Sequence, residues 1–150
     1  MNRWFYTQLW RIAPPLIRHY LKKRAVKSPA YLYHWGERFG EPFDRPVQRP
    51  IWVHAVSVGE TRAAQPLVEA LRRHFPDAPL LMTQMTPTGR AAAKELFPDA
   101  QCRYLPYDKP EWVAQFLKEH RPLFGVLMET EIWPNLMHAC ADAHVPLFLA

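Results

Sequence analysis

The sequence predicts an α/β fold in which a parallel β-sheet with flanking helices follows a basic N-terminal segment. Five apolar runs of strand length recur along residues 51–150, and amphipathic helical patterns separate them. Strands that alternate with single helices imply right-handed β-α-β crossovers, and these produce a parallel, Rossmann-like sheet. With 150 residues, of which 49% are hydrophobic and 13% aromatic, the chain is long enough for one domain with its own core.

Residues 1–27 form a basic, aromatic N-terminal segment. The first 30 residues hold seven Lys and Arg and no Asp or Glu, whereas the remainder holds 12 basic and 14 acidic residues. The longest charge-free run in this segment is seven residues, Trp4 to Trp10, whereas a bilayer span needs about 20. Aromatic and basic side chains without acids suit a helix lying on an anionic membrane surface. An arm packed on the rest of the protein is the alternative.

Two further expectations concern this segment. The adjacent Pro14 and Pro15 are expected to bend or interrupt any helix here. Because the excess of positive charge belongs to the N-terminus, the rest of the domain is not expected to bind nucleic acid.

The remaining elements follow in order. Residues 28–50 are expected to form a helical and proline-rich linker. The expected strands are residues 51–55, 79–83, 102–106, 123–128 and 146–150, and the expected helices are residues 61–75, 88–96, 110–120 and 134–143. Pro66 is best tolerated in an opening turn, and Asp108 is the expected N-cap of the helix that Pro110 opens. Since no helix follows the last strand, we expect a piece of a longer protein.

Several common site types are missing from the sequence. It has no G-x-G-x-x-G, no Walker-type G-x-x-x-x-G-K-[ST], no Asp-x-Asp and no G-x-S-x-G. Cys102 and Cys140 have neither CxxC nor metal-ligand spacing, so we expect two buried, reduced thiols. No cofactor and no metal are therefore expected.

Ligands of parallel sheets bind at the carboxyl ends of the strands, so the loops that follow the strands are the candidate sites. The first is Ser57-Val58-Gly59-Glu60. Glu60 either stabilises a helix start through the macrodipole or acts as a general base, and a base must be ionised to act. Ser57 and Gly59 beside it are candidate substrate-binding residues.

Two later loops supply the other candidates. "METEIWPN" places Glu129, Glu131 and Trp133 beyond a buried strand, which is more than a helix start requires. "TPTG" followed by arginine offers hydroxyls, a helix start and a cation that suit phosphate, although an ordinary turn into a helix fits as well. The candidate substrate-binding residues of this loop are Thr86, Thr88, Gly89 and Arg90.

At these loops the sequence resembles a known family. "WGERFG", "VHAVSVGET", "MTPTG", "YLPYD" and "METEIWPN", in this order and spacing, are similar to the N-terminal half of 3-deoxy-D-manno-octulosonic acid (Kdo) transferases. The resemblance runs from about Trp4 to Ala150. These enzymes build the inner core of bacterial lipopolysaccharide.

The resemblance implies a GT-B glycosyltransferase, in which residues 51–150 form the domain that binds lipid IVA, the lipid A precursor. An absent C-terminal domain would bind CMP-Kdo, so this chain alone is expected to be inactive. It also implies inverting Kdo transfer at the cytoplasmic face of the inner membrane. Glu60 falls on the family's general base, and Glu129, or less favourably Glu131, on the acid that stabilises the transition state.

Two alternatives remain open on the sequence. One is a truncated, non-catalytic domain that binds lipid A precursor or membrane. The other is a nucleotide-dependent oxidoreductase, against which the missing G-x-G-x-x-G counts.

Overall fold

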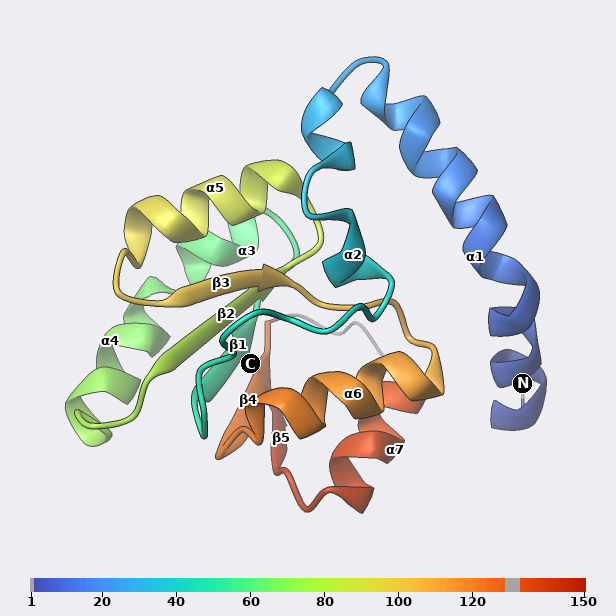
Figure 1. Ribbon diagram of the computed structural model, residues 1–150. Coiled ribbons are helices and arrows are strands. Elements are labelled where there is room, and N and C mark those ends of the chain that lie inside the picture. The colour runs from blue at the N-terminus through green and yellow to red at the C-terminus, as the bar shows by residue number, and fades with distance from the viewer. Residues whose placement is uncertain (1, 129–132) are drawn as a thin grey trace.

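The computed structural model describes residues 2–128 and 133–150 and contains one five-stranded sheet. The strands are β1 (Ile51–His54), β2 (Leu80–Gln84), β3 (Gln101–Tyr104), β4 (Phe124–Leu127) and β5 (Leu147–Leu149). Their order is β3-β2-β1-β4-β5, and every neighbouring pair is parallel. The predicted α/β, Rossmann-like fold is confirmed (Figure 1).

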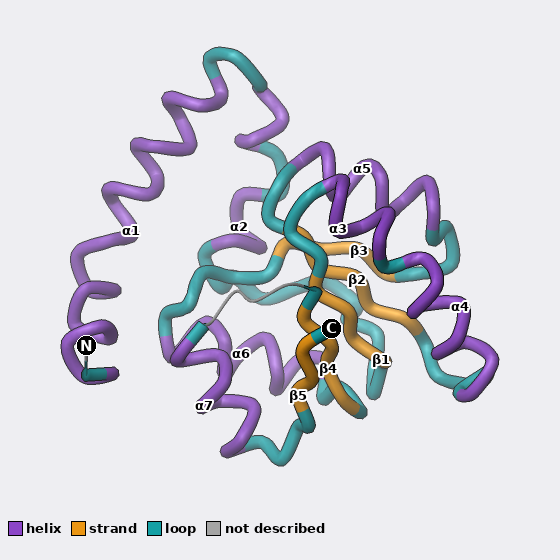
Figure 2. Tube along the Cα trace, turned by 180° about the vertical axis from the view of Figure 1, so that it is seen from behind, coloured by secondary structure: helices purple, strands orange, loops and turns teal. Residues whose placement is uncertain are grey.

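Helices cover both faces of the sheet. The helices α3 (Val58–Ala63), α4 (Gln65–His74) and α5 (Pro87–Leu96) gather on one side, and α6 (Pro110–His120) and α7 (Pro134–Asp142) lie on the other (Figures 1 and 2). Because side chains alternate along a strand, neighbouring residues enter different cores. Val53 and Met82 pack with α4 and α5, whereas Trp52 and Leu81 pack with α6 and α7.

The region predicted as one helix, residues 61–75, is two helices. Helix α3 begins at Val58, directly at the strand end, and α4 begins at Gln65 with Pro66 in its first turn. In an uninterrupted helix the Pro66 ring would clash with the carbonyl of Arg62, so the chain starts a new helix instead. The expected place of Pro66 is confirmed, and the expected helix start at residue 61 was wrong.

The N-terminal segment forms α1 (Arg3–Ala25), which contains Pro14 and Pro15. The two prolines do not interrupt the helix, but Figure 1 shows α1 bending along its length. The prolines have no N–H to donate to the carbonyls one turn earlier, so α1 lacks two of its helical hydrogen bonds there. Within the described part of the chain, no helix has both the length and the apolar character needed to cross a membrane.

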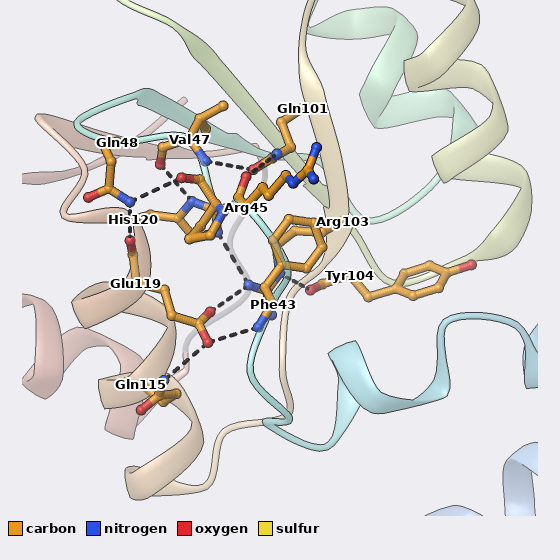
Figure 3. Close-up of polar contacts among 11 residues, drawn as sticks. Phe43, Arg45, Val47, Gln48, Gln101, Arg103, Tyr104, Gln115, Glu119 and His120 are labelled. Atoms are coloured by element: carbon orange, nitrogen blue, oxygen red, sulfur yellow. Dashed lines mark hydrogen bonds and ion pairs between the residues drawn. The ribbon is translucent and has the colours of Figure 1, made fainter.

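Residues 28–50 contain η1 (Pro29–Leu32) and α2 (Trp35–Arg38), and the segment after α2 packs tightly against the domain. Figure 3 shows residues of this segment meeting β3 and the end of α6. The Val47 N–H donates to Gln101 Oε1 at 2.9 Å, and Val47 O is 3.0 Å from His120 Nδ1. Buried Arg103 pairs with Glu119 at 2.9 Å. The segment is therefore part of the folded domain.

Two buried histidines make stability depend on pH. Burial lowers the pKa of His54 and of His120 to about 4, below the ordinary value of 6.5. The unfolded chain therefore binds more protons than the folded chain between pH 6.5 and about 4. This stabilisation is complete above pH 6.5 and is lost as the pH falls toward 4.

We expect the melting temperature to fall steadily between pH 7 and 4.5, as measured by circular dichroism. His120→Gln should reduce the slope, because one of the two titrating groups is gone. Exposed His19→Gln is the matched control and should keep the wild-type slope. An unchanged slope in His120→Gln would show that His120 does not contribute.

Candidate functional site

The candidate site lies at the carboxyl ends of β1 and β2. Parallel strands point the same way, so the loops that follow them meet at one edge. Residues 55–57 lead into α3, and residues 85–86 lead into α5. The Met85 and Thr86 N–H groups both donate to Val56 O, at 3.1 and 3.3 Å, so the two loops are joined. Glu129 and Glu131 lie outside the described residues.

Glu60 lies in the first turn of α3 and is half-buried. Its Oε2 accepts a hydrogen bond from the Val56 N–H at 2.5 Å. In a capping box the acid at this helix position accepts from the N-cap residue, which here is Ser57. The Glu60 carboxylate instead accepts from Val56, the residue before the N-cap. The carboxylate is thus held over the strand-to-helix turn while keeping partial exposure.

The two candidate glycines differ in their surroundings. A Cβ at Gly89 would come within 2.8 Å of Thr86 Oγ1 and 3.0 Å of Val56 O, so a side chain there would push the two loops apart. Among the described residues, a Cβ at exposed Gly59 would meet nothing within 4 Å. Gly89 is therefore required for packing, whereas the described residues leave space at Gly59, next to Glu60.

The candidate hydroxyl groups differ in their hydrogen bonds and exposure. Thr86 is the N-cap of α5, and its Oγ1 accepts from the Gly89 N–H at 3.0 Å. Thr88 is exposed in the first turn of α5. Ser57 is the N-cap of α3, but among the described residues its hydroxyl makes no capping hydrogen bond. Ser57 and Thr88 are therefore better placed than Thr86 to meet a ligand.

Arg90 is buried rather than exposed. Its guanidinium forms an ion pair with Glu37 of α2 and lies 4.9 Å from the centre of the Tyr104 ring. Part of its charge is thus already balanced by a carboxylate. The phosphate-binding role expected for Arg90 stays a prediction.

Two residues that sequence reasoning missed lie beside Arg90. Arg38, 1% exposed, donates to Met85 O at 2.7 Å and lies 3.8 Å from the Tyr104 ring centre. Gln84 ends β2 opposite Tyr104 and is 0% exposed. Within the described part of the chain, Nε and Nη2 of Arg38 and both amide atoms of Gln84 have no hydrogen-bond partner. Such groups are rare in proteins. A glutamine at the end of a strand whose residues are all buried was the available sequence signal.

His54 and Trp133 meet on the other side of the same edge. Their ring centres are 5.8 Å apart, and His54 Nδ1 is 2.8 Å from Thr83 Oγ1. His54 is neutral at pH 7, since burial lowers its pKa to about 4. Trp133, which precedes α7, is thereby placed at the end of β1, so the structure brings one residue of the predicted "METEIWPN" site to the strand that leads to Glu60.

The expected N-cap role of Asp108 at α6 was wrong. Lys109 occupies that position, and the Asp108 carboxylate accepts from the backbone N–H groups of Asn135 at 2.9 Å and Leu136 at 2.7 Å. Asp108 therefore caps α7. Helices α6 and α7 pack side by side, which brings the start of α7 to Asp108, one residue before the N-cap of α6. Burial raises the pKa of Asp108, and these hydrogen bonds oppose the shift.

Other features lie outside this site. A groove of about 760 Å³ runs between α6 and α7 and includes Lys118, Arg121 and His138. It extends toward residues that precede β4 and β5, away from the edge where parallel sheets bind ligands. Among the described residues, no three His, Cys, Asp or Glu side chains form a group that could hold a metal ion.

Comparison with known proteins decides the family. Residues 33–150 match the family model for 3-deoxy-D-manno-octulosonic-acid transferase (kdotransferase). The chain belongs to the Kdo transferase family. This membership counts against the oxidoreductase alternative. The parallel sheet and its two helical layers are consistent with the N-terminal domain of a GT-B glycosyltransferase.

Individual Kdo transferases give the same result over the whole chain. The 3-deoxy-D-manno-octulosonic acid transferase of Haemophilus influenzae is 39% identical, over all of this chain and 36% of that protein. The Bordetella pertussis enzyme of the same name is 43% identical, over 99% of this chain and 37% of that protein. A probable mitochondrial 3-deoxy-D-manno-octulosonic acid transferase of Arabidopsis thaliana is 34% identical, over 90% of this chain and 31% of that protein. The chain thus spans about a third of the length of these Kdo transferases.

Proposed function

We propose that this chain is the acceptor-binding part of an enzyme that transfers Kdo from CMP-Kdo to lipid IVA, with Glu60 as general base. The observation that carries the proposal is the position of Glu60, a partly exposed residue in the first turn after β1, next to the space that the described residues leave at Gly59. Family membership supplies the reaction class.

The chemistry requires a glucosamine hydroxyl of lipid IVA to lose its proton as its oxygen attacks the anomeric carbon of Kdo. The bond from that carbon to the CMP phosphate breaks, and CMP leaves with the electron pair. Glu60 accepts the hydroxyl proton. A neighbouring N–H, that of Val56, stabilises the ionised form of the carboxylate. Glu129, with Glu131 as the less favoured choice, is proposed to stabilise the transition state.

The other candidate residues would hold the acceptor. Ser57 and Thr88 offer hydroxyls at the starts of α3 and α5, and Trp133 offers a flat apolar surface beside the strand ends. The N-terminal ends of helices attract anions, which suits the phosphates of lipid IVA. Arg90 adds positive charge behind this surface. The donor CMP-Kdo would be held mainly by the part of the enzyme that lies beyond this chain.

Helix α1 is proposed to hold the enzyme at the cytoplasmic face of the inner membrane, where the acceptor is anchored. Five large apolar side chains of α1 are between 49% and 68% exposed: Trp4, Phe5, Leu9, Ile12 and Leu16. The basic residues Lys22, Lys23 and Arg24 lie in its last turn. Apolar side chains enter the membrane interface, and each nearby cation adds about 1 kcal/mol on an anionic leaflet.

The direct test is to incubate the full-length protein with CMP-Kdo and lipid IVA and to weigh the lipid product by mass spectrometry. We expect an increase by one or more Kdo units. Binding of lipid IVA without any increase in mass would instead favour the non-catalytic lipid-binding alternative.

The space that the described residues leave at Gly59 leads to a separate prediction. Gly59→Ala is expected to keep or raise stability, because alanine is favoured over glycine in a helix by about 0.5–1 kcal/mol. The added methyl group would occupy the space proposed for the acceptor. We therefore expect the KM for lipid IVA to rise about 10-fold, as measured in steady-state transfer assays.

Gly89→Ala is the contrasting variant. Its Cβ would contact Thr86 Oγ1 and Val56 O too closely, so it should destabilise the fold by about 1–3 kcal/mol. A Gly59→Ala enzyme with an unaltered KM would show that the acceptor does not approach this glycine.

A further inference from the structure

Asp108 joins three segments that are far apart in sequence. Its carboxylate accepts hydrogen bonds from the first turn of α7, at Asn135 and Leu136, and also from the Tyr6 hydroxyl of α1 at 2.8 Å. The residue is only 2% exposed. Burial raises the pKa of Tyr6 to about 12, so the phenol stays protonated and donates. One buried carboxylate therefore holds α1 and α7 together.

Additional contacts surround this junction. The Asn135 side-chain amide donates to Asp108 O at 2.8 Å, and the Thr7 hydroxyl donates to Asn135 Oδ1 at 3.2 Å. The Trp10 ring stacks on Tyr107 with centres 6.1 Å apart. Both views of the chain show the N-terminal end of α1 on the side of the domain where α6 and α7 start (Figures 1 and 2). The inner side of α1 is thus fixed at its first two turns.

The two helices that Asp108 joins, α1 and α7, have different surroundings. Residues of α1 that point away from the domain, among them Phe5 and Leu9, carry the exposed apolar surface. The first turn of α7 follows Trp133, which contacts His54 at the end of β1. A shift of α1 relative to the domain would therefore affect the first turn of α7 through the hydrogen bonds of Asp108 with Tyr6 and Asn135.

We propose that Asp108 is a positioning residue that couples the binding of α1 to an anionic membrane to the geometry of the first turn of α7. The proposal rests on the proposed function, which assigns the membrane to α1 and the acceptor to the strand edge. When α1 is held on the membrane, Tyr6 stays bonded to Asp108, and the Asp108 carboxylate keeps the α7 cap closed. When α1 moves, the cap loosens.

Amide hydrogen exchange of Asn135 and Leu136, measured in the full-length protein with and without anionic phosphatidylglycerol vesicles, tests the coupling. Vesicles should slow exchange of both amides about fivefold or more, the change that one net hydrogen bond corresponds to. Tyr6→Phe should bind vesicles as well as the wild type does but lose this slowing. A purely structural role of Asp108 would protect the amides equally with and without vesicles.

Tyr33→Phe is the matched control, because it removes a phenol from an exposed side chain outside α1. It should retain the vesicle-dependent slowing. Vesicle binding without any change in exchange, or the same change in Tyr6→Phe as in the wild type, would overturn the coupling while leaving the proposed function standing. Failure of the wild type to bind vesicles would overturn both the coupling and the membrane role of α1, and a missing transferase activity would affect only the proposed function.

Discussion

Replacing Glu60 by Gln is expected to reduce the turnover of the full-length enzyme by at least about 100-fold, because general-base catalysis contributes roughly 10²–10⁴-fold. The amide cannot take up the acceptor proton. Its oxygen can still accept the Val56 N–H, so the strand-to-helix turn should keep its shape. The measurement is kcat from transfer assays with saturating CMP-Kdo and lipid IVA, together with the melting temperature.

Glu69→Gln is the matched control for this variant, since Glu69 is exposed on the neighbouring α4. It removes one carboxylate from the same face of the domain and should leave turnover unchanged. Turnover at the wild-type level in Glu60→Gln would show that Glu60 is not the general base.

The second large effect concerns stability. Glu119→Ala is expected to destabilise the domain by about 3–5 kcal/mol, since it leaves a buried guanidinium without its carboxylate. Arg103 is 1% exposed and pairs with Glu119, which also accepts from the Phe43 N–H at 3.0 Å. Figure 3 shows that both contacts converge on the Glu119 carboxylate. Urea denaturation followed by circular dichroism gives the free energy of unfolding.

Glu111→Ala on the same helix provides the comparison. Glu111 is exposed in the first turn of α6, where a carboxylate gains about 0.3–1 kcal/mol from the helix dipole. Glu111→Ala should therefore lower the free energy of unfolding by no more than about 1 kcal/mol. If both variants lower the free energy of unfolding equally little, the Arg103–Glu119 pair does not stabilise the packing of the segment after α2 on the domain.

Local sequence patterns were sufficient to predict the sheet. Strands buried on both faces appear as short apolar runs, and the run "IWVHA" corresponds to β1 with one residue of difference at its end. The same logic found the remaining strands to within a few residues. The proline at position 66 was correctly expected in an opening turn, but its effect on the preceding residues was underestimated, so α3 and α4 were merged.

Contacts between distant residues could not be predicted in the same way. Asp108 stands one residue before the N-cap of α6, and a local rule assigns it to that helix. Its actual partner, the start of α7, is about 27 residues away in the chain, and only the packing of α6 on α7 brings them together. The ion pair of Arg90 with Glu37 likewise joins residues that only the packing of distant segments brings together.

Only part of the candidate site could be predicted from the sequence. The position of Glu60 in the first turn of a helix after a strand was predictable, because both neighbours are local. The unpartnered groups of Arg38 and Gln84 were not, because burial and the absence of a partner within the described residues are properties of the packed domain.

The central claim is that the acceptor hydroxyl lies against the side chain at position 60. The most direct measurement is a crystal structure of full-length Glu60→Gln with bound lipid IVA. We predict a glucosamine hydroxyl oxygen at hydrogen-bond distance, about 2.6–3.2 Å, from the residue 60 side chain. A lipid IVA headgroup bound elsewhere, for example in the groove between α6 and α7, would contradict the account.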